Sequence, residues 1–227
     1  MACALVATRW AGPSQRRLFS SVSIHENNHQ RWIRGVILSG SKTRLLGYVR
    51  SFSHCLGTHV GTYRMRDLPQ DAGGYLPGLR NIHSLTFRRI MIENVGERGL
   101  RICFSAFRET VTHLALYIFK TSFDAFVALV DYFPNIRVLQ LRPEGLKPDE
   151  GPVPTLSRPL RGKVYVDCVQ ADCYRFLDRF ARLDLEYEGL VIDSSVRPLG
   201  TGFLQSALQI SASTVKYLRL IPEFGCE

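Results

Sequence analysis

The 227-residue sequence lacks long hydrophobic runs, and its composition is ordinary. The longest apolar runs, such as Phe126–Val130, are far shorter than the ~20 residues that span a bilayer, which excludes a membrane-spanning helix. A hydrophobic content of 45% and a charged content of 22% exclude a disordered or low-complexity chain. A chain of this length holds one large domain or two small ones, and it needs no metal or disulfide for stability.

Paired cysteines are also absent, although the sequence has six cysteines. The closest two, Cys168 and Cys173, have neither a second pair nor a nearby histidine to complete a tetrahedral zinc site. Cys103 and Cys168 lie in apolar surroundings, where a thiol behaves as a small hydrophobic group. Free thiols fit a reducing compartment, so we expect the cytoplasm or the nucleus and no bound metal.

Several motifs that carry catalysis are missing as well. The sequence has no Gly-x-Ser-x-Gly, no P-loop and no Gly-x-Gly-x-x-Gly. We interpret Gly200-Thr201-Gly202 as an ordinary turn rather than an anion site. Asp167 with Asp172, or Asp184 with Glu186, offer paired carboxylates, but alternating strand positions and helix surfaces explain them equally well. We therefore expect no enzyme activity and no cofactor.

Acidic residues are scarce in the first part of the chain. Met1–Arg66 holds ten Lys and Arg residues and a single acid, Glu26, whereas Asp67–Glu227 holds nineteen residues of each sign. Such a one-sided positive field attracts an acidic or phosphate-rich partner, and the excess of Arg, 24 against 5 Lys, suits pairing with carboxylate or phosphate. The alternative is a solvated surface. Nucleic acid is not the expected partner, because the chain has no dense basic run and no recognition helix.

What the sequence does contain is a repeat, in which an apolar residue is followed three and five residues later by leucine or a similar residue. Each Leu-x-Leu doublet has the period of two that a short strand with one buried face requires. The anchoring residues are separated by irregular steps, from 19 residues (Val164 to Leu183) to 35 (Leu183 to Leu218). The doublets are Leu85 and Phe87, Leu114 and Leu116, Leu139 and Leu141, Leu183 and Leu185, and Leu218 and Leu220, with weaker copies at Phe52 and His54 and at Val164 and Val166.

Helical patterns lie between the doublets. Over Ser122–Phe133 the apolar residues recur at helical spacing, with Ser122 as the N-cap and Pro134 beyond the end. Strands that alternate with helices predict an α/β fold with a parallel sheet. Similar helices are expected over Glu97–Arg108, Ala171–Phe180 and Gly202–Ser211, and loops over Asp67–Gly78 and Pro143–Arg161.

The doublets resemble leucine-rich repeats, whose pattern is L-x-x-L-x-L-x-x-N/C-x-L. Ile92, Leu146 and Leu190 meet the last apolar position, but no copy has Asn or Cys at the Asn/Cys position two residues before it. The resemblance therefore implies an irregular leucine-rich-repeat-like solenoid, with the parallel sheet on the concave side and the helices on the convex side. Its outward strand positions imply a partner-binding face made of Arg88, His113, Tyr117, Gln140, Arg142, Lys163, Tyr165, Asp184, Tyr217 and Arg219.

The N-terminal segment resembles the last helix of an F-box and the strand that leads into a repeat domain. The helix is expected over Ala2–Trp10, with Leu5, Val6 and Trp10 buried, and the strand is expected to start with Leu18, Phe19 and Val22. Together with the repeats, this resembles the F-box/leucine-rich-repeat proteins of mushroom-type fungi. It divides the chain into an F-box remnant (1–24) and a repeat domain (25–227) that is uncapped at its C-terminal end.

In that family the F-box binds a Skp-type adaptor of a cullin ubiquitin ligase, and the repeats present a substrate protein. Because only the tail of an F-box is present, adaptor binding is expected only if the missing helices are restored. A membrane is not an expected partner. One alternative is a bare interaction scaffold or a gene-model fragment. Another is a mitochondrial protein, since Met1–Ile24 has Arg9, Arg16 and Arg17 and no acid, as a presequence does.

Overall fold

The structure, a computed structural model, has an α/β fold built on one ten-stranded sheet. It describes residues 8–25, 45–55, 63–64, 76–92, 96–146, 151–167, 176, 179–180, 182–183, 185–194 and 217–222. The helices are α1 (Thr8–Leu18), α5 (Gly96–Phe104) and α6 (Phe123–Tyr132), with 3-10 turns at η4 (Leu76–Gly78) and η5 (Ser105–Phe107). None of the helices in the described part is long and apolar enough to cross a membrane.

The sheet grows by one strand at a time, nearly in the order of the sequence. Its main path runs β1-β2-β4-β6-β7-β8-β9-β10, and the short strands β3 and β5 extend it beside β6. All of the described strand pairings are parallel, which confirms the predicted parallel sheet. The strands are β1 (Ser21–His25), β2 (Ser51–Cys55), β3 (Tyr63–Arg64), β4 (Ser84–Arg88), β5 (Ile90–Ile92), β6 (His113–Thr121), β7 (Val138–Leu146), β8 (Leu160–Asp167), β9 (Leu185–Ser194) and β10 (Tyr217–Pro222).

The doublets stack in register from strand to strand and form two rows, which we call the core lanes. The first is Val22, Phe52, Leu85, Leu114, Leu139, Val164, Leu190 and Leu218, and the second is Ile24, His54, Phe87, Leu116, Leu141, Val166, Ile192 and Leu220. From β1 to β8 every core-lane residue is buried. The predicted strand positions on β2, β4, β6, β7, β8 and β10 are therefore confirmed.

The predicted doublet of β9 was wrong. Leu183 precedes the strand, and Leu185 pairs with Leu160 at the beginning of β8. The residue that pairs with Val164 is Leu190. With Leu190 as the anchor, the steps become 26 residues from Val164 and 28 residues to Leu218, so the irregular values of 19 and 35 disappear. The error arose because β9 begins earlier than its neighbours and carries two apolar doublets.

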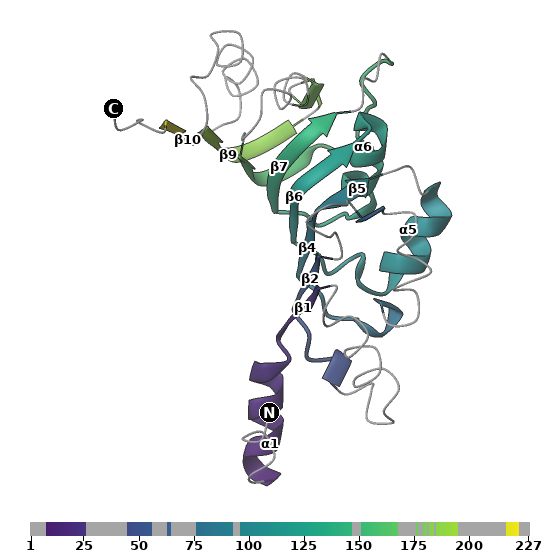
Figure 1. Cartoon of the computed structure of the whole chain (residues 1–227), viewed down its shortest axis with the longest axis vertical. Coiled ribbons are helices and arrows are strands. Elements are labelled where there is room, and N and C mark those ends of the chain that lie inside the picture. The colour runs from purple at the N-terminus through teal and green to yellow at the C-terminus, as the bar shows by residue number, and fades with distance from the viewer. Residues whose placement is uncertain are drawn as a thin grey trace.

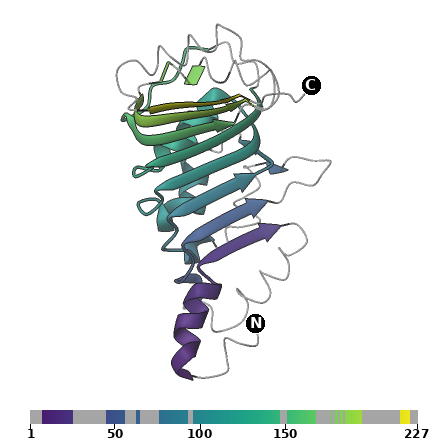
Figure 2. The same ribbon diagram turned by 90° about the vertical axis from the view of Figure 1, so that its left-hand side faces the viewer.

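The described helices α5 and α6 cover one side of the sheet. Figure 1 shows α5 and α6 on the same side, and Figure 2 faces the opposite side, over which no helix of the described part lies. We call this opposite side the open face. Successive residues of a strand point to opposite sides of the sheet. Since the core-lane residues point to the helix side, the residues between them point to the open face.

On the helix side, α6 packs against the sheet through phenylalanines. Ser122 caps the helix by accepting a hydrogen bond from the Ala125 backbone N–H, as predicted. The rings of Phe126 and Phe176 have centroids 5.0 Å apart, and Phe119 of β6 lies 5.6 Å from Phe176. Of the helix predicted over Ala171–Phe180, the described residues 176, 179 and 180 are helical, and both phenylalanines are buried.

Several predicted boundaries differ from the structure. The N-terminal helix continues to Leu18, which is 54% exposed, so neither Leu18 nor Phe19 starts the first strand. Leu5 and Val6 lie outside the described residues. The helix expected over Glu97–Arg108 is divided into α5 and η5.

The loop predicted over Pro143–Arg161 is shorter in the structure, because strands occupy both of its ends. β7 continues through Pro143, which the sequence placed in a loop. Proline is accommodated because Pro143 sits at a register shift opposite Phe119, where the regular hydrogen-bond ladder is interrupted. Of the loop expected over Asp67–Gly78, only Leu76–Gly78 is described, as the 3-10 turn η4. Residues 202–211, predicted as a helix, lie outside the described residues.

Gly162 is required where β8 changes register against β9. Its φ of +117° is accessible to glycine, and a Cβ there would collide with the backbone carbonyl of Arg137. That carbonyl accepts the backbone N–H of Lys163 at 2.8 Å, so it cannot move without loss of a hydrogen bond.

We therefore expect Gly162→Ala to lower the free energy of unfolding by about 2–3 kcal/mol. Gly12→Ala is the matched control, because Gly12 lies in α1 with no atom within 4 Å of an added Cβ. This control should be neutral or stabilising by up to about 1 kcal/mol, as for glycine in a helix interior. Urea unfolding measures both, and equal midpoints for Gly162→Ala and the parent would contradict the assignment.

Candidate functional site

Three rows of side chains point to the open face, and we call them the outward lanes. The first is Ser21, Ser51, Ser84, His113, Val138 and Lys163; the second is Ser23, Ser53, Thr86, Ala115, Gln140 and Tyr165; the third is His25, Cys55, Arg88, Tyr117, Arg142 and Asp167. Their register follows from the core lanes, because successive residues of a strand point to opposite sides. Most of them are partly or fully exposed.

The first three strands of the open face present hydroxyl groups. All six positions of the first and second outward lanes on β1, β2 and β4 are Ser or Thr. On β1 the hydroxyl of Ser23 lies 2.9 Å from His25 Nε2, in hydrogen-bond contact. Because hydroxyl side chains are short, the first and second outward lanes project little from the sheet on these strands. The first long, charged side chain of the lanes is Arg88 on β4.

Arg88, Tyr117 and Gln140 form a connected group on three adjacent strands. The guanidinium carbon of Arg88 lies 5.0 Å from the centre of the Tyr117 ring, within the range of a cation–π interaction. The Tyr117 hydroxyl donates a hydrogen bond to Gln140 Oε1 at 2.7 Å. Together these contacts hold the Tyr117 ring in one orientation, and they place an arginine, an aromatic ring and an amide side by side.

A second polar contact joins β7 to β8. Arg142 Nε and Asp167 Oδ2 are 3.5 Å apart, and the two side chains are 40% and 34% exposed. An ion pair with this much exposure contributes little to stability, because water screens the attraction. Its position in the third outward lane makes it part of the surface that a partner would meet.

The structure places seven of the ten predicted binding residues on these lanes. They are Arg88, His113, Tyr117, Gln140, Arg142, Lys163 and Tyr165. Tyr217 and Arg219 lie on β10 in register with Gly189 and Val191, in line with the first and second outward lanes. Asp184 lies outside the described residues. The role of all ten in binding stays a prediction.

Two parts of the site were missed. Asp167 was considered only as half of a carboxylate pair with Asp172, yet it follows Tyr165 by two residues and so belongs to the same face. The hydroxyl positions of β1 and β2 were also missed. The alternation in Ser21–His25 and Ser51–Cys55 carries the signal, because polar and buried residues alternate there with a period of two.

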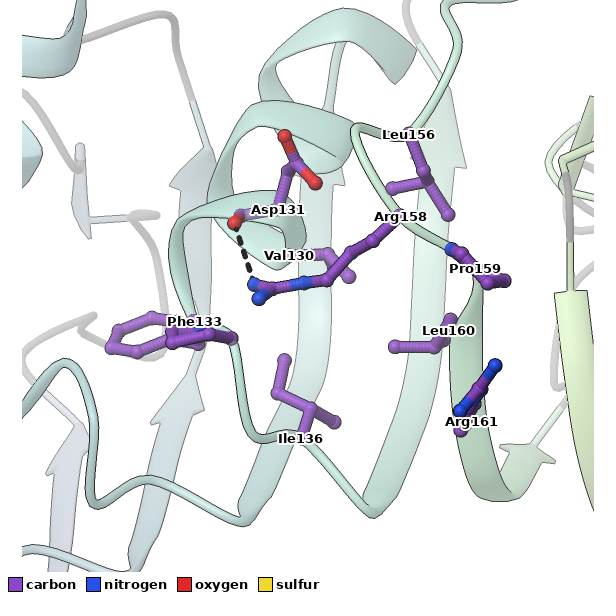
Figure 3. Close-up of a pocket in the computed structure, with 10 residues that line it drawn as sticks. Val130, Asp131, Phe133, Ile136, Leu156, Arg158, Pro159, Leu160 and Arg161 are labelled. Atoms are coloured by element: carbon purple, nitrogen blue, oxygen red, sulfur yellow. Dashed lines mark hydrogen bonds between the residues drawn. The ribbon is translucent and has the colours of Figure 1, made fainter.

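A cavity on the other side of the sheet is a second place where a ligand could bind. It has a volume of about 370 Å³, and apolar residues such as Phe133, Ile136 and Leu160 line most of it. Figure 3 shows Arg158 extended across it, with a hydrogen bond of 3.1 Å from its guanidinium to the backbone carbonyl of Asp131. That carbonyl is in the last turn of α6, so the arginine serves as a C-terminal cap of the helix. We therefore attribute the cavity to packing.

Arg108, which precedes α6 in the sequence, caps the same end of the helix as Arg158, which follows it. Its Nε donates to the carbonyl of Tyr132 at 2.8 Å, and its guanidinium carbon lies 5.2 Å from the Tyr132 ring centre. α6 itself has no basic residue in its last turn. Both arginines therefore support the fold and are not available as site residues.

Neither a metal site nor a reactive Cys103 is found among the described residues. No three His, Cys, Asp or Glu side chains of that part gather closely enough to hold a metal ion. Cys103 is buried on α5, and burial raises the pKa of its thiol from 9.0 to about 12. The expectation that Cys103 acts as a small hydrophobic group is confirmed, whereas Cys168 and Cys173 lie outside the described residues.

Comparison with known proteins gives no independent guide to the site. No family model, no curated protein and no solved structure matches the chain. The resemblance to F-box/leucine-rich-repeat proteins therefore remains a hypothesis, and the function has to be argued from the open face itself.

The Arg142–Asp167 pair should contribute little to the free energy of unfolding. We expect a double-mutant cycle with Arg142→Ala and Asp167→Ala to give a coupling energy below about 1 kcal/mol, because both side chains are substantially exposed. Denaturant unfolding of the parent, the two single variants and the double variant measures it. A coupling above about 2 kcal/mol would show that the pair is structural.

Burial of Cys103 should make the protein less stable at alkaline pH. Above pH 9 the unfolded thiol ionises while the folded thiol stays protonated up to about pH 12, so this group favours unfolding as the pH rises through that window. We expect Cys103→Ala to flatten the fall in Tm between pH 8.5 and 10.5. An unchanged slope in Cys103→Ala would contradict this role of the buried thiol.

Proposed function

We propose that this protein is a non-enzymatic interaction scaffold, an irregular leucine-rich-repeat-like solenoid that binds a protein partner on its open face. The observation that carries the proposal is the stacking of repeated doublets in register across one parallel sheet. A surface of this kind grows with each repeat and presents one row of side chains per strand to a partner.

The steps between anchors support the repeat interpretation. From Val22 to Leu218 each anchor follows the previous one after 25 to 33 residues. The shortest steps are Leu114 to Leu139 and Leu139 to Val164, and the longest is Phe52 to Leu85. Regular leucine-rich repeats span about 20–29 residues, so these units overlap that range and exceed it. The bend of the sheet away from α5 and α6 in Figure 1 is consistent with a concave open face.

The order of elements at the N-terminal end supports the further resemblance. α1 is followed after two residues by β1, which is the first strand of the main path. A helix that leads directly into the first strand is what the F-box resemblance implies. On this proposal the chain is similar to the substrate-recognition part of an F-box subunit of a cullin ubiquitin ligase, and its ligand is a protein.

The two sides of the sheet carry different kinds of side chain, which also favours a binding role. Apolar packing is concentrated in the core lanes and under α6, whereas the outward lanes carry hydroxyl, aromatic and charged side chains. Tyrosine and arginine, the residues most often central to protein interfaces, lie together at Arg88 and Tyr117.

We expect Arg142→Glu combined with Tyr165→Ala to keep the fold and to lose the protein partners that proximity labelling recovers in cells. Both side chains are partly exposed in outward lanes, so their replacement removes no core packing. The matched control is Arg98→Glu with Ile102→Ala, the same two types of change at exposed positions of α5 on the helix side. Unchanged partner recovery by the open-face variant, with its Tm preserved, would refute the proposal.

Pull-down with a purified Skp-type adaptor tests the adaptor part of the resemblance. We expect weak or no capture by this chain, and tight capture would contradict the expectation that adaptor binding needs the missing F-box helices.

A further inference from the structure

From β1 to β8, the open face has more cationic groups and hydrogen-bond donors than acids. On the strands from β1 to β8, its outward lanes carry Arg88, Arg142 and Lys163 against a single carboxylate, Asp167. Most other lane positions are hydroxyl, imidazole or phenol groups, which can all donate hydrogen bonds. The surface therefore complements a ligand that supplies negatively charged acceptors.

The spacing of the cations indicates the form of that ligand. Arg88, Tyr117 and Arg142 are direct neighbours across β4, β6 and β7 in the third outward lane. Because adjacent strands are about 4.8 Å apart, the two arginines start from backbone positions about 10 Å apart. Residues three apart in a polyproline II chain lie about 9 Å apart on one side of it. An extended chain crossing the strands thus brings successive acidic residues to the two arginines, with Tyr117 between them.

We infer that the open face binds an extended, acidic segment of a partner protein across β4 to β8. Arg88 and Arg142 pair with carboxylates three residues apart, the Tyr117 and Tyr165 rings contact the residues between and beside them, and Lys163 adds charge attraction from the first outward lane. This inference rests on the proposed function and deepens it by naming the chemistry of the partner.

Asp167 acts as an internal competitor on this surface. It lies 3.5 Å from Arg142 and so occupies the cation that the partner's carboxylate would engage. Loss of the Asp167 charge should therefore strengthen binding of an acidic segment. A purely structural role of Asp167 would not produce this gain of affinity.

A nucleic acid fits the same surface less well. Proteins that hold nucleic acid through its backbone neutralise about 6–10 phosphates, whereas the outward lanes from β1 to β8 offer three cations. The charge is also interrupted by Asp167, which would lie against a continuous row of phosphates.

The test uses the full chain and fluorescein-labelled peptides of one backbone, (Glu-Pro-Pro)5, (Gln-Pro-Pro)5 and (Lys-Pro-Pro)5, with oligo-dT as the nucleic-acid probe. Fluorescence anisotropy at 150 mM salt should show binding of the Glu peptide at least tenfold tighter than that of the Gln peptide, and no binding of the Lys peptide. Arg142→Gln should weaken binding of the Glu peptide about three- to tenfold, and Asp167→Asn should tighten its binding about two- to fivefold. Arg98→Gln and Asp124→Asn change the net charge equally on the helix side and should have little effect.

Three results would overturn the inference: equal binding of the Glu and Gln peptides, tighter binding of oligo-dT than of the Glu peptide, or equal effects of the helix-side and open-face charge changes. These results leave the proposed function standing if Arg142→Glu with Tyr165→Ala still loses its cellular partners. If that variant keeps its partners, the proposed function itself has failed.

Discussion

The packing of two buried side chains from each strand against the equivalent pair on the next strand is the interaction on which the sheet depends. Each buried Leu, Phe or Val contributes about 1.5–3 kcal/mol relative to an exposed side chain, and the core lanes repeat this contribution at every strand. A slip of one residue would turn a whole strand over, placing Ser and Arg in the core. Even His54, the polar member of the second core lane, is 1% exposed, with its ring 6.1 Å from that of Phe87.

The helix side shows how neighbouring repeats depend on one another. α6 ends without a basic residue of its own, and its last carbonyls accept hydrogen bonds from Arg108, before β6, and Arg158, before β8. Arginine near a helix C-terminus is stabilised by the helix dipole as well as by the hydrogen bond. Each arginine therefore links one repeat to the next in addition to the sheet ladder, and these contacts commit Arg108 and Arg158 to packing.

The sequence predicts most of this arrangement, because the period of two and the apolar doublets are local signals. Parallel pairing, the core lanes from β2 to β8 and the N-cap at Ser122 follow from it. The β9 anchor could not be found in this way, since Leu183, Leu185 and Leu190 are all apolar and only pairing with β8 decides among them. The end of β7 was missed for a related reason, because Pro143 normally ends a strand but here occupies a register shift. The seven binding candidates on β4 to β8 lie on the open face, as predicted. Asp167 was omitted because the sequence does not show that β8 extends as far as this residue.

The separation of core lanes from outward lanes has a consequence for specificity. Because register is fixed by alternate residues, the residues between them can change without disturbing the pairing, so one ladder can carry different binding faces. The contacts present here already divide the face into a low hydroxyl part on β1 to β4 and a taller charged and aromatic part from Arg88 to Asp167. The taller part contains both the cations that attract an acidic chain and the one carboxylate that competes with it. Selectivity on such a surface comes from that competition, since a partner must offer more than Asp167 already supplies to Arg142.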